Sequence, residues 1–284
     1  MNTALGIIGY PIGHSMSPVF QQAALDACGV DARYVAYQVA PDEVEEFVNG
    51  LRQPGIMGIN VTVPHKLAVM PFLDEIDDWA TEAGAVNTIV NRDGRLTGHN
   101  TDGYGFLRAL REGAGFEPAG RRTLILGAGG AARGVVLALA REGVGEFTIA
   151  NRTHERAENL AELALNRGVT ARAIPLSGAD LATAAAHAEL IVNCTTIGMT
   201  HGPAEAESPL PGGAIPSTAL VYDLVYNPLE TPLIREAAQV GLATLGGIVM
   251  LVYQGAASFE MWLERPAPVP VMMEAAIRAM QSRS

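Results

Sequence analysis

The 284-residue sequence predicts an α/β protein of two domains, the second built on a doubly wound parallel sheet. Two observations support this prediction. Short apolar runs alternate with amphipathic stretches along most of the chain, as is typical of strands joined by crossover helices. In addition, a glycine-rich turn, Gly127–Ala132, directly follows one of the apolar runs and precedes a helix-like stretch.

The first domain is expected over residues 1–112. Its strands are predicted at 5–9, 33–39 and 56–63, and its helices at 17–28, 42–51 and 104–112. Ser17 before Pro18 predicts a hydroxyl cap at the start of the first helix. A helix-like segment follows Lys66 to about Leu73, and Asp93-Gly94 predicts a hairpin between strands at 86–91 and 95–98.

The second domain is expected over residues 121–247, after a glycine- and proline-containing linker at 113–120. Its predicted strands are 123–126, 147–150, 171–174, 190–193, 220–224 and 243–245, and its predicted helices are 130–142, 154–166, 180–187 and 232–239. Residues 201–216 are expected to form a loop. Two further helices, at 249–263 and 269–280, follow the last strand. We therefore expect residues 248–284 to return to the first domain and complete it.

The composition limits the classes of partner and site. The net charge of −11 argues against nucleic acid or an anionic membrane as the main partner. The first residues carry no secretion signal and no apolar run reaches spanning length, so a cytoplasmic location is expected. The two cysteines and six histidines show no ligand spacing, and therefore no metal site is predicted.

The glycine-rich turn favours a dinucleotide. Gly127 permits the tight turn, Gly129 allows close approach of a pyrophosphate to the backbone, and Ala132 lets helix and strand pack closely. The helix that follows presents unpaired N–H groups and a partial positive charge to phosphate oxygens. The alternative is a glycine-rich connection that binds nothing.

The end of the next strand indicates which dinucleotide is bound. NAD-binding chains usually place an acidic residue there, but this chain has Asn151, Arg152 and, one helical turn later, Arg156. Guanidinium groups bind a 2′-phosphate, which a carboxylate would repel. The sequence therefore favours NADP(H) over NAD(H). The alternative is that both arginines lie on a solvated helix face.

The first domain contains candidate acid–base chemistry. Lys66 follows the end of a strand, and Asp102 precedes a helix. Taken alone, the lysine suits solvent and the aspartate suits a helix cap. Together they form a pair able to pass a proton to or from a hydroxyl during hydride transfer. Uncharged hydrogen-bonding groups that suit a polyhydroxylated substrate stand beside glycines or strand ends: Ser15, Ser17, Thr62, Asn87, Thr101 and Gln254. His14 and His65 are expected to be structural.

Nine motifs in order along the chain carry a family resemblance: His14-Ser15-x-Ser17-Pro18, Asn60-Val61-Thr62-x-Pro64-x-Lys66, Gly84-Ala85-x-Asn87-Thr88, Gly98-x-Asn100-Thr101-Asp102-Gly103, Gly127–Ala132, Asn151-Arg152-Thr153, Asn193-x-Thr195-x-x-Gly198-Met199, Asp223-x-x-Tyr226-Asn227-Pro228 and Gly247-x-x-Met250-Leu251-x-x-Gln254-Gly255. With these motifs the chain resembles the shikimate dehydrogenase family over essentially its whole length. In that family the form GxGxxA is normal.

The resemblance implies reversible, NADPH-dependent reduction of 3-dehydroshikimate to shikimate. It implies a catalytic pair, Lys66 and Asp102, and a substrate carboxylate held by Ser15 and Ser17. The rest of the implied substrate pocket is Thr62, Asn87, Tyr226 and Gln254. The implied cofactor residues are Gly127, Ala128, Gly129, Gly130, Ala131, Asn151, Arg152, Thr153, Arg156, Leu224, Gly247, Met250 and, on weaker grounds, Asp78. It also implies that the C-terminal helices pack on an N-terminal substrate domain beside a Rossmann-type NADP-binding domain.

Two rival functions remain open at this point. One is a quinate/shikimate dehydrogenase that uses NAD, which the absence of an acidic residue at Asn151-Arg152 disfavours. The other is a non-catalytic sensor of nucleotide or a shikimate-like ligand, which the presence of both Lys66 and Asp102 disfavours. The sequence is compatible with a monomer or a homodimer.

Overall fold

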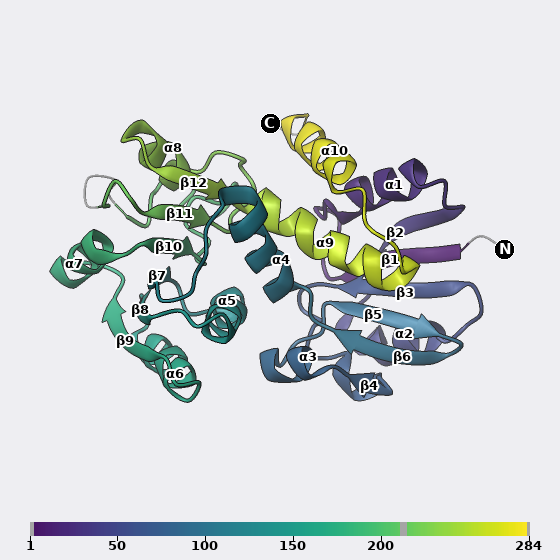
Figure 1. Ribbon diagram of the computed structural model, residues 1–284. Helices are drawn as coiled ribbons and strands as arrows, with labels where there is room; N and C mark the ends of the chain where they lie inside the picture. The colour runs from purple at the N-terminus through teal and green to yellow at the C-terminus, as the bar shows by residue number, and fades with distance from the viewer. Residues whose placement is uncertain (1–2, 211–214, 283–284) are drawn as a thin grey trace. The chain divides into compact units, whose positions relative to one another are not determined.

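The computed structural model describes residues 3–210 and 215–282 (Figure 1). The chain forms two compact units. One unit runs to Gly105 and resumes at Val252, and the other is Phe106–Leu251. Both boundaries fall inside helices, namely α4 (Asp102–Arg108) and α9 (Gly247–Leu263). The predicted linker at 113–120 instead lies within the second unit, where Ala119 forms a β-bridge with Val144.

The first unit contains a mixed six-stranded sheet in the order β2-β1-β3-β5-β6-β4. Its strands are β1 (Thr3–Gly9), β2 (Ala32–Gln38), β3 (Ile56–Val61), β4 (Glu75–Ile76), β5 (Thr88–Arg92) and β6 (Arg95–His99). Strand β1 pairs in parallel with β2 and β3, whereas β5 is antiparallel to β3 and β6. The predicted hairpin is confirmed, and Asp93 and Gly94 both have positive φ angles, as its two-residue turn requires.

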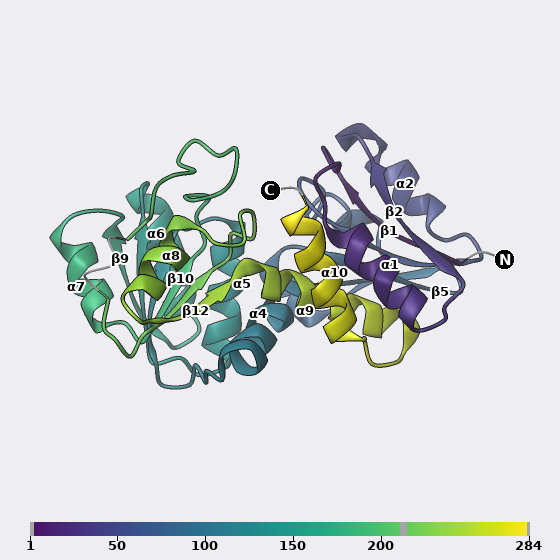
Figure 2. The same cartoon turned by 90° about the horizontal axis from the view of Figure 1, so that it is seen from above.

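Helices cover both faces of this sheet. Helix α1 (Ser17–Ala27) packs against α10 (Val269–Gln281), while α2 (Val44–Gly50) lies on the opposite face (Figure 2). Helix α9 contributes Trp262, which is 1% exposed and donates from Nε1 to the Ile89 carbonyl at 3.0 Å. The expected return of the C-terminal helices to the first unit is therefore confirmed.

Several local predictions in this unit are wrong. Met16, not Ser17, is the N-cap residue of α1, and no side chain caps that helix. The helix expected at 42–51 is a 3₁₀ turn, Pro41–Glu43, followed by the seven-residue α2. The helix-like segment after Lys66 consists of turns and one 3₁₀ turn, Met70–Phe72, because Pro71 lacks the N–H that a continuing α-helix needs.

One helix of this unit is absent from the sequence-based expectations. Helix α3 (Asp78–Ala83) begins at Asp77, whose side chain accepts from the Ala80 N–H at 2.6 Å, and it ends at Gly84 in a left-handed conformation. Helix α4 begins at Asp102, two residues before its predicted start, and it continues into a π-helical turn, Ala109–Gly113.

The second unit confirms the doubly wound prediction. Its six strands pair in parallel in the order β9-β8-β7-β10-β11-β12. They are β7 (Arg122–Leu126), β8 (Glu146–Asn151), β9 (Thr170–Pro175), β10 (Leu190–Asn193), β11 (Leu220–Asp223) and β12 (Ala243–Gly246). The strand order reverses between β7 and β10, and ligands of such sheets bind beyond the carboxyl ends of the strands at that reversal.

Among the described residues, four crossover helices lie wholly within the second unit: α5 (Gly130–Arg141), α6 (His154–Leu165), α7 (Ala179–His187) and α8 (Pro232–Gln239). Right-handed crossovers place α5 and α6 on one face and α7 and α8 on the other. Leu124 and Leu126 of β7 accordingly share a core cluster with Leu181 of α7 and Leu233 of α8. Among the described residues, no helix is long and apolar enough to cross a membrane.

Candidate active site

Lys66 and Asp102 meet in the first unit. The lysine Nζ donates to Oδ2 of Asp102 at 2.5 Å, and the two side chains are 30% and 28% exposed. The aspartate thus faces the lysine at the start of α4 instead of capping that helix. The pair is open to solvent on one side, so a hydroxyl or carbonyl of a ligand has access to both groups.

Asn87 holds the other oxygen of this aspartate. Its Nδ2 donates to Asp102 Oδ1 at 2.8 Å, and its Oδ1 accepts from the Thr101 N–H at 2.8 Å. Gln254 Oε1, on α9, lies 3.5 Å from Asn87 Nδ2. Four of the predicted substrate residues, Lys66, Asn87, Asp102 and Gln254, are therefore brought together, although their sequence positions are far apart.

The turn after β3 positions Lys66. The Thr62 N–H donates to the Ile8 carbonyl at 2.9 Å, and the Lys66 carbonyl accepts from the Val86 N–H at 2.8 Å. Between them, His65 is completely buried, with Nε2 2.7 Å from the Val39 carbonyl. Because a carbonyl only accepts, Nε2 carries the proton, and His65 acts as an anchor for the turn, in agreement with its expected structural role.

The two predicted carboxylate-binding serines lie at the start of α1. Ser15 is half-buried, and its Oγ accepts from the Ser17 N–H at 3.3 Å. Ser17 is 5% exposed, and its side chain lies near that of Tyr34. The Ser17 hydroxyl does not cap the helix and faces β2 instead. The eighth predicted substrate residue, Tyr226, is half-buried and follows β11 in the second unit.

The predicted cofactor turn has the shape that a pyrophosphate needs. Gly127 has φ +101°, and a Cβ there would lie 3.1 Å from the Cys194 backbone. In contrast, a Cβ on Gly129 or Gly130 would meet no atom within 4 Å. Helix α5 begins at Gly130 without a side-chain cap, so its first N–H groups face this open space beside Ala128 and Ala131. The backbone therefore fits a bound pyrophosphate.

The loop after β8 fits a 2′-phosphate. Asn151 Nδ2 donates to the Thr153 carbonyl at 2.8 Å and so shapes the connection to α6. Arg152 and Arg156 are both exposed, and neither forms a salt bridge within the described part of the chain. Two guanidinium groups without a salt bridge in the described residues, one just after β8 and one in the first turn of α6, match the requirement for NADP(H).

Leu224 and Gly247, both predicted to line the cofactor site, are in direct contact. A Cβ on Gly247 would lie 2.3 Å from the Leu224 carbonyl, so no other residue fits there without a backbone shift. Met250 is half-buried one turn later on α9. Asp78, the weakest of the cofactor predictions, is exposed in the first turn of α3 in the other unit.

Sequence reasoning missed a buried group at the ends of β10 and β11. Asp223 is 0% exposed and accepts from Asn193 Nδ2 at 2.9 Å, the Val225 N–H at 3.0 Å and the Thr231 hydroxyl at 2.6 Å. Burial raises the pKa of the Asp223 carboxyl, partly offset by these hydrogen bonds. The group fixes the two loops that carry Thr195 and Leu224. The signal was available, because Asn193 and Asp223 both occur in the quoted motifs.

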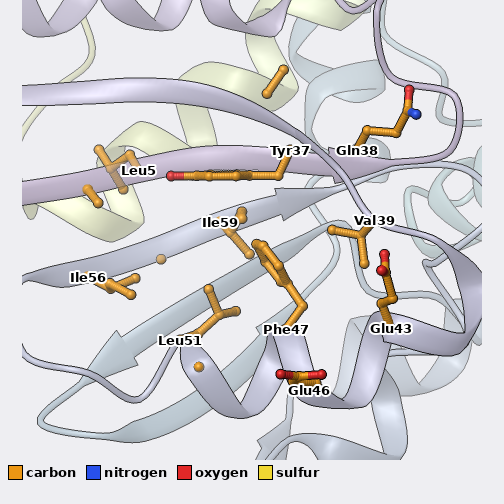
Figure 3. A pocket seen from close by; sticks show the side chains of 14 residues that line it. Leu5, Tyr37, Gln38, Val39, Glu43, Glu46, Phe47, Leu51, Ile56 and Ile59 are labelled. Atoms are coloured by element: carbon orange, nitrogen blue, oxygen red, sulfur yellow. The ribbon is translucent and has the colours of Figure 1, made fainter.

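A cavity of about 750 Å³ in the first unit is separate from these groups. It lies between the sheet and α2, and its apolar walls include Leu5, Tyr37, Phe47 and Ile59 (Figure 3). Its lining contains none of the predicted substrate or cofactor residues. The candidate site therefore consists of the polar groups around Lys66 and the open glycine turn, and this cavity is not part of it.

Comparison with known proteins agrees with the geometry. The family model of the shikimate dehydrogenase substrate binding domain matches residues 7–89, that of shikimate/quinate 5-dehydrogenase matches residues 112–200, and that of the shikimate 5′-dehydrogenase C-terminal domain matches residues 247–277. The chain is 49% identical over 282 residues to shikimate dehydrogenase (NADP(+)) of Symbiobacterium thermophilum, covering 98% of this chain and 95% of that protein.

Solved structures show the same fold. Shikimate 5-dehydrogenase of Thermus thermophilus, in complex with NADP(H) and shikimate, is similar with a TM-score of 0.85 and 38% identity, covering 98% of this chain and 99% of that one. Quinate dehydrogenase of Corynebacterium glutamicum, in complex with NAD, is similar with a TM-score of 0.88 and 30% identity, covering 98% and 99%. On these matches, the chain belongs to the shikimate dehydrogenase family.

Proposed function

We propose that this protein catalyses the reversible, NADPH-dependent reduction of 3-dehydroshikimate to shikimate. The observation that carries the proposal is the 2.5 Å contact between Lys66 and Asp102, partly exposed and surrounded by uncharged hydrogen-bonding side chains. Family membership supports the reaction class, and this pair supplies its acid–base chemistry.

The residues divide the work of the reaction. Bound NADPH supplies the hydride that forms the new C–H bond at C3 of the substrate. Lys66 then donates a proton from Nζ to the developing alkoxide, and the same group accepts it in the reverse direction. Asp102 accepts from Nζ and, held by Asn87, orients the lysine and a substrate hydroxyl. The unit that contains this pair is the proposed substrate domain.

The remaining groups hold the substrate. Ser15 and Ser17 would donate to its carboxylate from their hydroxyl groups, because both stand at the start of α1, where the helix dipole favours an anion. Thr62, Asn87, Tyr226 and Gln254 would hydrogen-bond its hydroxyl groups. These four side chains are uncharged hydrogen-bonding groups, which suit the hydroxyl groups of a polyhydroxylated ring.

The second unit is the proposed NADP-binding domain. Gly127–Ala131 and the N-terminus of α5 would hold the pyrophosphate, and Leu224 with Gly247 and Met250 would line the nicotinamide end. Asn151, Arg152, Thr153 and Arg156 would surround the 2′-phosphate. Asp78 is proposed only as an accessory contact. The preference for NADP(H) over NAD(H) rests on the two exposed arginines, which form no salt bridge within the described residues.

A spectrophotometric assay tests the proposal. The purified protein is incubated with shikimate or quinate at matched concentrations, each with NADP⁺ or NAD⁺, and reduced nicotinamide is followed by absorbance. We expect shikimate with NADP⁺ to give the highest kcat/KM. Faster turnover of quinate with NAD⁺ would support the rival dehydrogenase, and no turnover of either substrate would support a sensor.

A further inference from the structure

A continuous set of buried hydrogen bonds extends between the two ends of the proposed substrate site. We call it the Tyr34–Asp102 network. Its members are Tyr34, Asn60, Ser258, Thr88, Thr101, Asn87 and Asp102, and Ser17 lies beside Tyr34 at one end. Four of them, Tyr34, Asn60, Thr88 and Ser258, have no assigned role in binding or chemistry. All members belong to the first unit.

Tyr34 begins the network at the serine end. Its side chain is 5% exposed, lies near Ser17, and donates from its hydroxyl to Asn60 Oδ1 at 2.6 Å. Burial raises the pKa of Tyr34 well above its ordinary value, so the hydroxyl keeps its proton and remains a donor. This donor fixes which side of the Asn60 amide faces β2, because only the oxygen accepts.

The fixed amide then directs its nitrogen toward the centre of the network. Asn60 Nδ2 lies 2.9 Å from Ser258 Oγ, 3.1 Å from Thr88 Oγ1 and 3.1 Å from the Asn87 carbonyl. Ser258 is 0% exposed on α9, and its hydroxyl lies 2.7 Å from Thr88 Oγ1 and 3.1 Å from the Gln254 carbonyl. The serine thus connects the sheet to the helix that carries Gln254.

Asn87 links the network to the Lys66–Asp102 pair. Its Oδ1 accepts from Thr88 Oγ1 at 3.0 Å and from the Thr101 N–H, so its Nδ2 is the atom that donates to Asp102. Reversing the Asn87 amide would place two oxygens against each other at 2.8 Å. A buried network in which each member fixes the next is rigid, and losing one member leaves its neighbours unsatisfied.

We propose that Tyr34, Asn60 and Ser258 are positioning residues that hold Ser17 and the Asn87–Asp102–Lys66 group in one frame, so that recognition at the serine end and proton transfer at the lysine end depend on each other. The inference rests on the proposed function for the roles of these two ends. None of the three residues needs to touch the substrate.

Two variants test the proposal by kinetics. Tyr34→Phe removes one hydroxyl at the serine end, and Ser258→Ala removes the hydroxyl that joins sheet and helix. We expect each to lower kcat by roughly 10- to 100-fold and to raise the KM for shikimate, because small displacements of catalytic groups are costly. We expect the KM for NADP⁺ to stay unchanged. A partial loss of folded protein would lower the apparent kcat without changing either KM, so kcat is normalised to the amount of folded protein measured by circular dichroism.

Tyr37→Phe is the matched control. Tyr37 is on the same strand but faces α2, where its ring packs 5.4 Å from that of Phe47. We expect its kinetic constants to equal those of the unchanged protein. Equal losses in Tyr34→Phe and Tyr37→Phe would overturn the proposal, since both remove a hydroxyl from β2 and only one belongs to the network.

The double variant Tyr34→Phe/Ser258→Ala separates a shared frame from two local effects. If the network acts as one frame, the double variant loses little more kcat than the more severely impaired single variant, because the frame is already broken. If the losses in the two single variants multiply, the residues act independently and the proposal is wrong.

A measurement without turnover distinguishes this proposal from the proposed function. Side-chain amide resonances are recorded by nuclear magnetic resonance in the unliganded protein, with Asn87 assigned by its loss in Asn87→Ser. We expect Tyr34→Phe to shift the Asn87 amide resonance, and Tyr37→Phe to leave it in place. An unmoved resonance overturns the network, whereas a shifted resonance in a protein that fails to oxidise shikimate overturns only the proposed function.

Discussion

Replacing Lys66 with alanine tests the proposed mechanism most directly. The substitution removes the proton donor and the 2.5 Å contact with Asp102, and it leaves that aspartate hydrogen-bonded to Asn87 at 2.8 Å. The rest of the site therefore keeps its frame. Both side chains of the pair are about one-third exposed, so water fills the vacated space without leaving a buried unpaired charge.

The expected magnitude follows from this geometry. General acid–base catalysis contributes about 10²- to 10⁴-fold, and a loss of roughly 10³ in kcat corresponds to about 4 kcal/mol of transition-state free energy. The ion pair contributes at most about 1 kcal/mol to folding, because exposed pairs are screened by solvent. The KM for shikimate should rise only slightly, because Asn87, Gln254 and the serines remain.

The assay follows NADP⁺ reduction at saturating shikimate, with kcat and KM determined separately and thermal unfolding recorded for both proteins. A large fall in kcat with a small change in KM indicates a group that acts mainly in the transition state. A kcat within tenfold of the unchanged protein would refute the assignment of Lys66 as proton donor. A loss confined to KM would instead assign Lys66 to substrate binding.

Three further predictions concern the second unit. The double variant Arg152→Ala/Arg156→Ala should raise the KM for NADP⁺ by roughly 10- to 100-fold and leave the KM for NAD⁺ unchanged. Equal effects on both cofactors would contradict a 2′-phosphate site. Arg278→Ala, on α10, is the control. Gly247→Ala should destabilise the fold by about 1–3 kcal/mol, because the new Cβ meets the Leu224 carbonyl at 2.3 Å; Gly134→Ala on α5, where a Cβ meets nothing, should not lower the unfolding temperature. Burial raises the pKa of Asp223, so the folded state holds its proton more tightly and the stability that this confers is lost as pH rises above about 4. Urea midpoints of the unchanged protein should therefore fall relative to those of Asp223→Asn as pH rises, and parallel curves would contradict the shift.

The arrangement of the second unit was predictable because its signals are local. Each of its strands is a short apolar run, and each crossover helix has its own apolar face, so the alternation alone predicts a doubly wound sheet. The segment from Lys66 to Ala83 was not predicted correctly. Met70 and Leu73 have helical spacing, but Pro71 interrupts the segment, and the six-residue α3 is specified mainly by the Asp77 cap.

Some residues of the candidate site were likewise predictable from local sequence, and others were not. The glycine turn and Arg152 were interpretable from the residues, because the backbone and charge requirements of a dinucleotide are local in sequence. Lys66 and Asp102 became specific only through the family resemblance, since each has an ordinary structural alternative. Tyr34 and Ser258 gave no signal. Their hydrogen bonds depend on β2 and α9 meeting Asn60, and such long-range contacts leave no pattern in the sequence.

The return of α9 to the first unit has a consequence for folding during synthesis. The second unit is continuous, so residues 106–251 can complete their core as they leave the ribosome. The first unit cannot complete its packing until Ser258 and Trp262 of α9 have been synthesised. At about 5–20 residues per second, the delay is on the order of ten seconds. During that time Asn60 lacks its partner on α9, and the Ile89 carbonyl lacks the indole N–H. We therefore expect the part of the chain that contains Lys66 and Asp102 to be made first and to fold last.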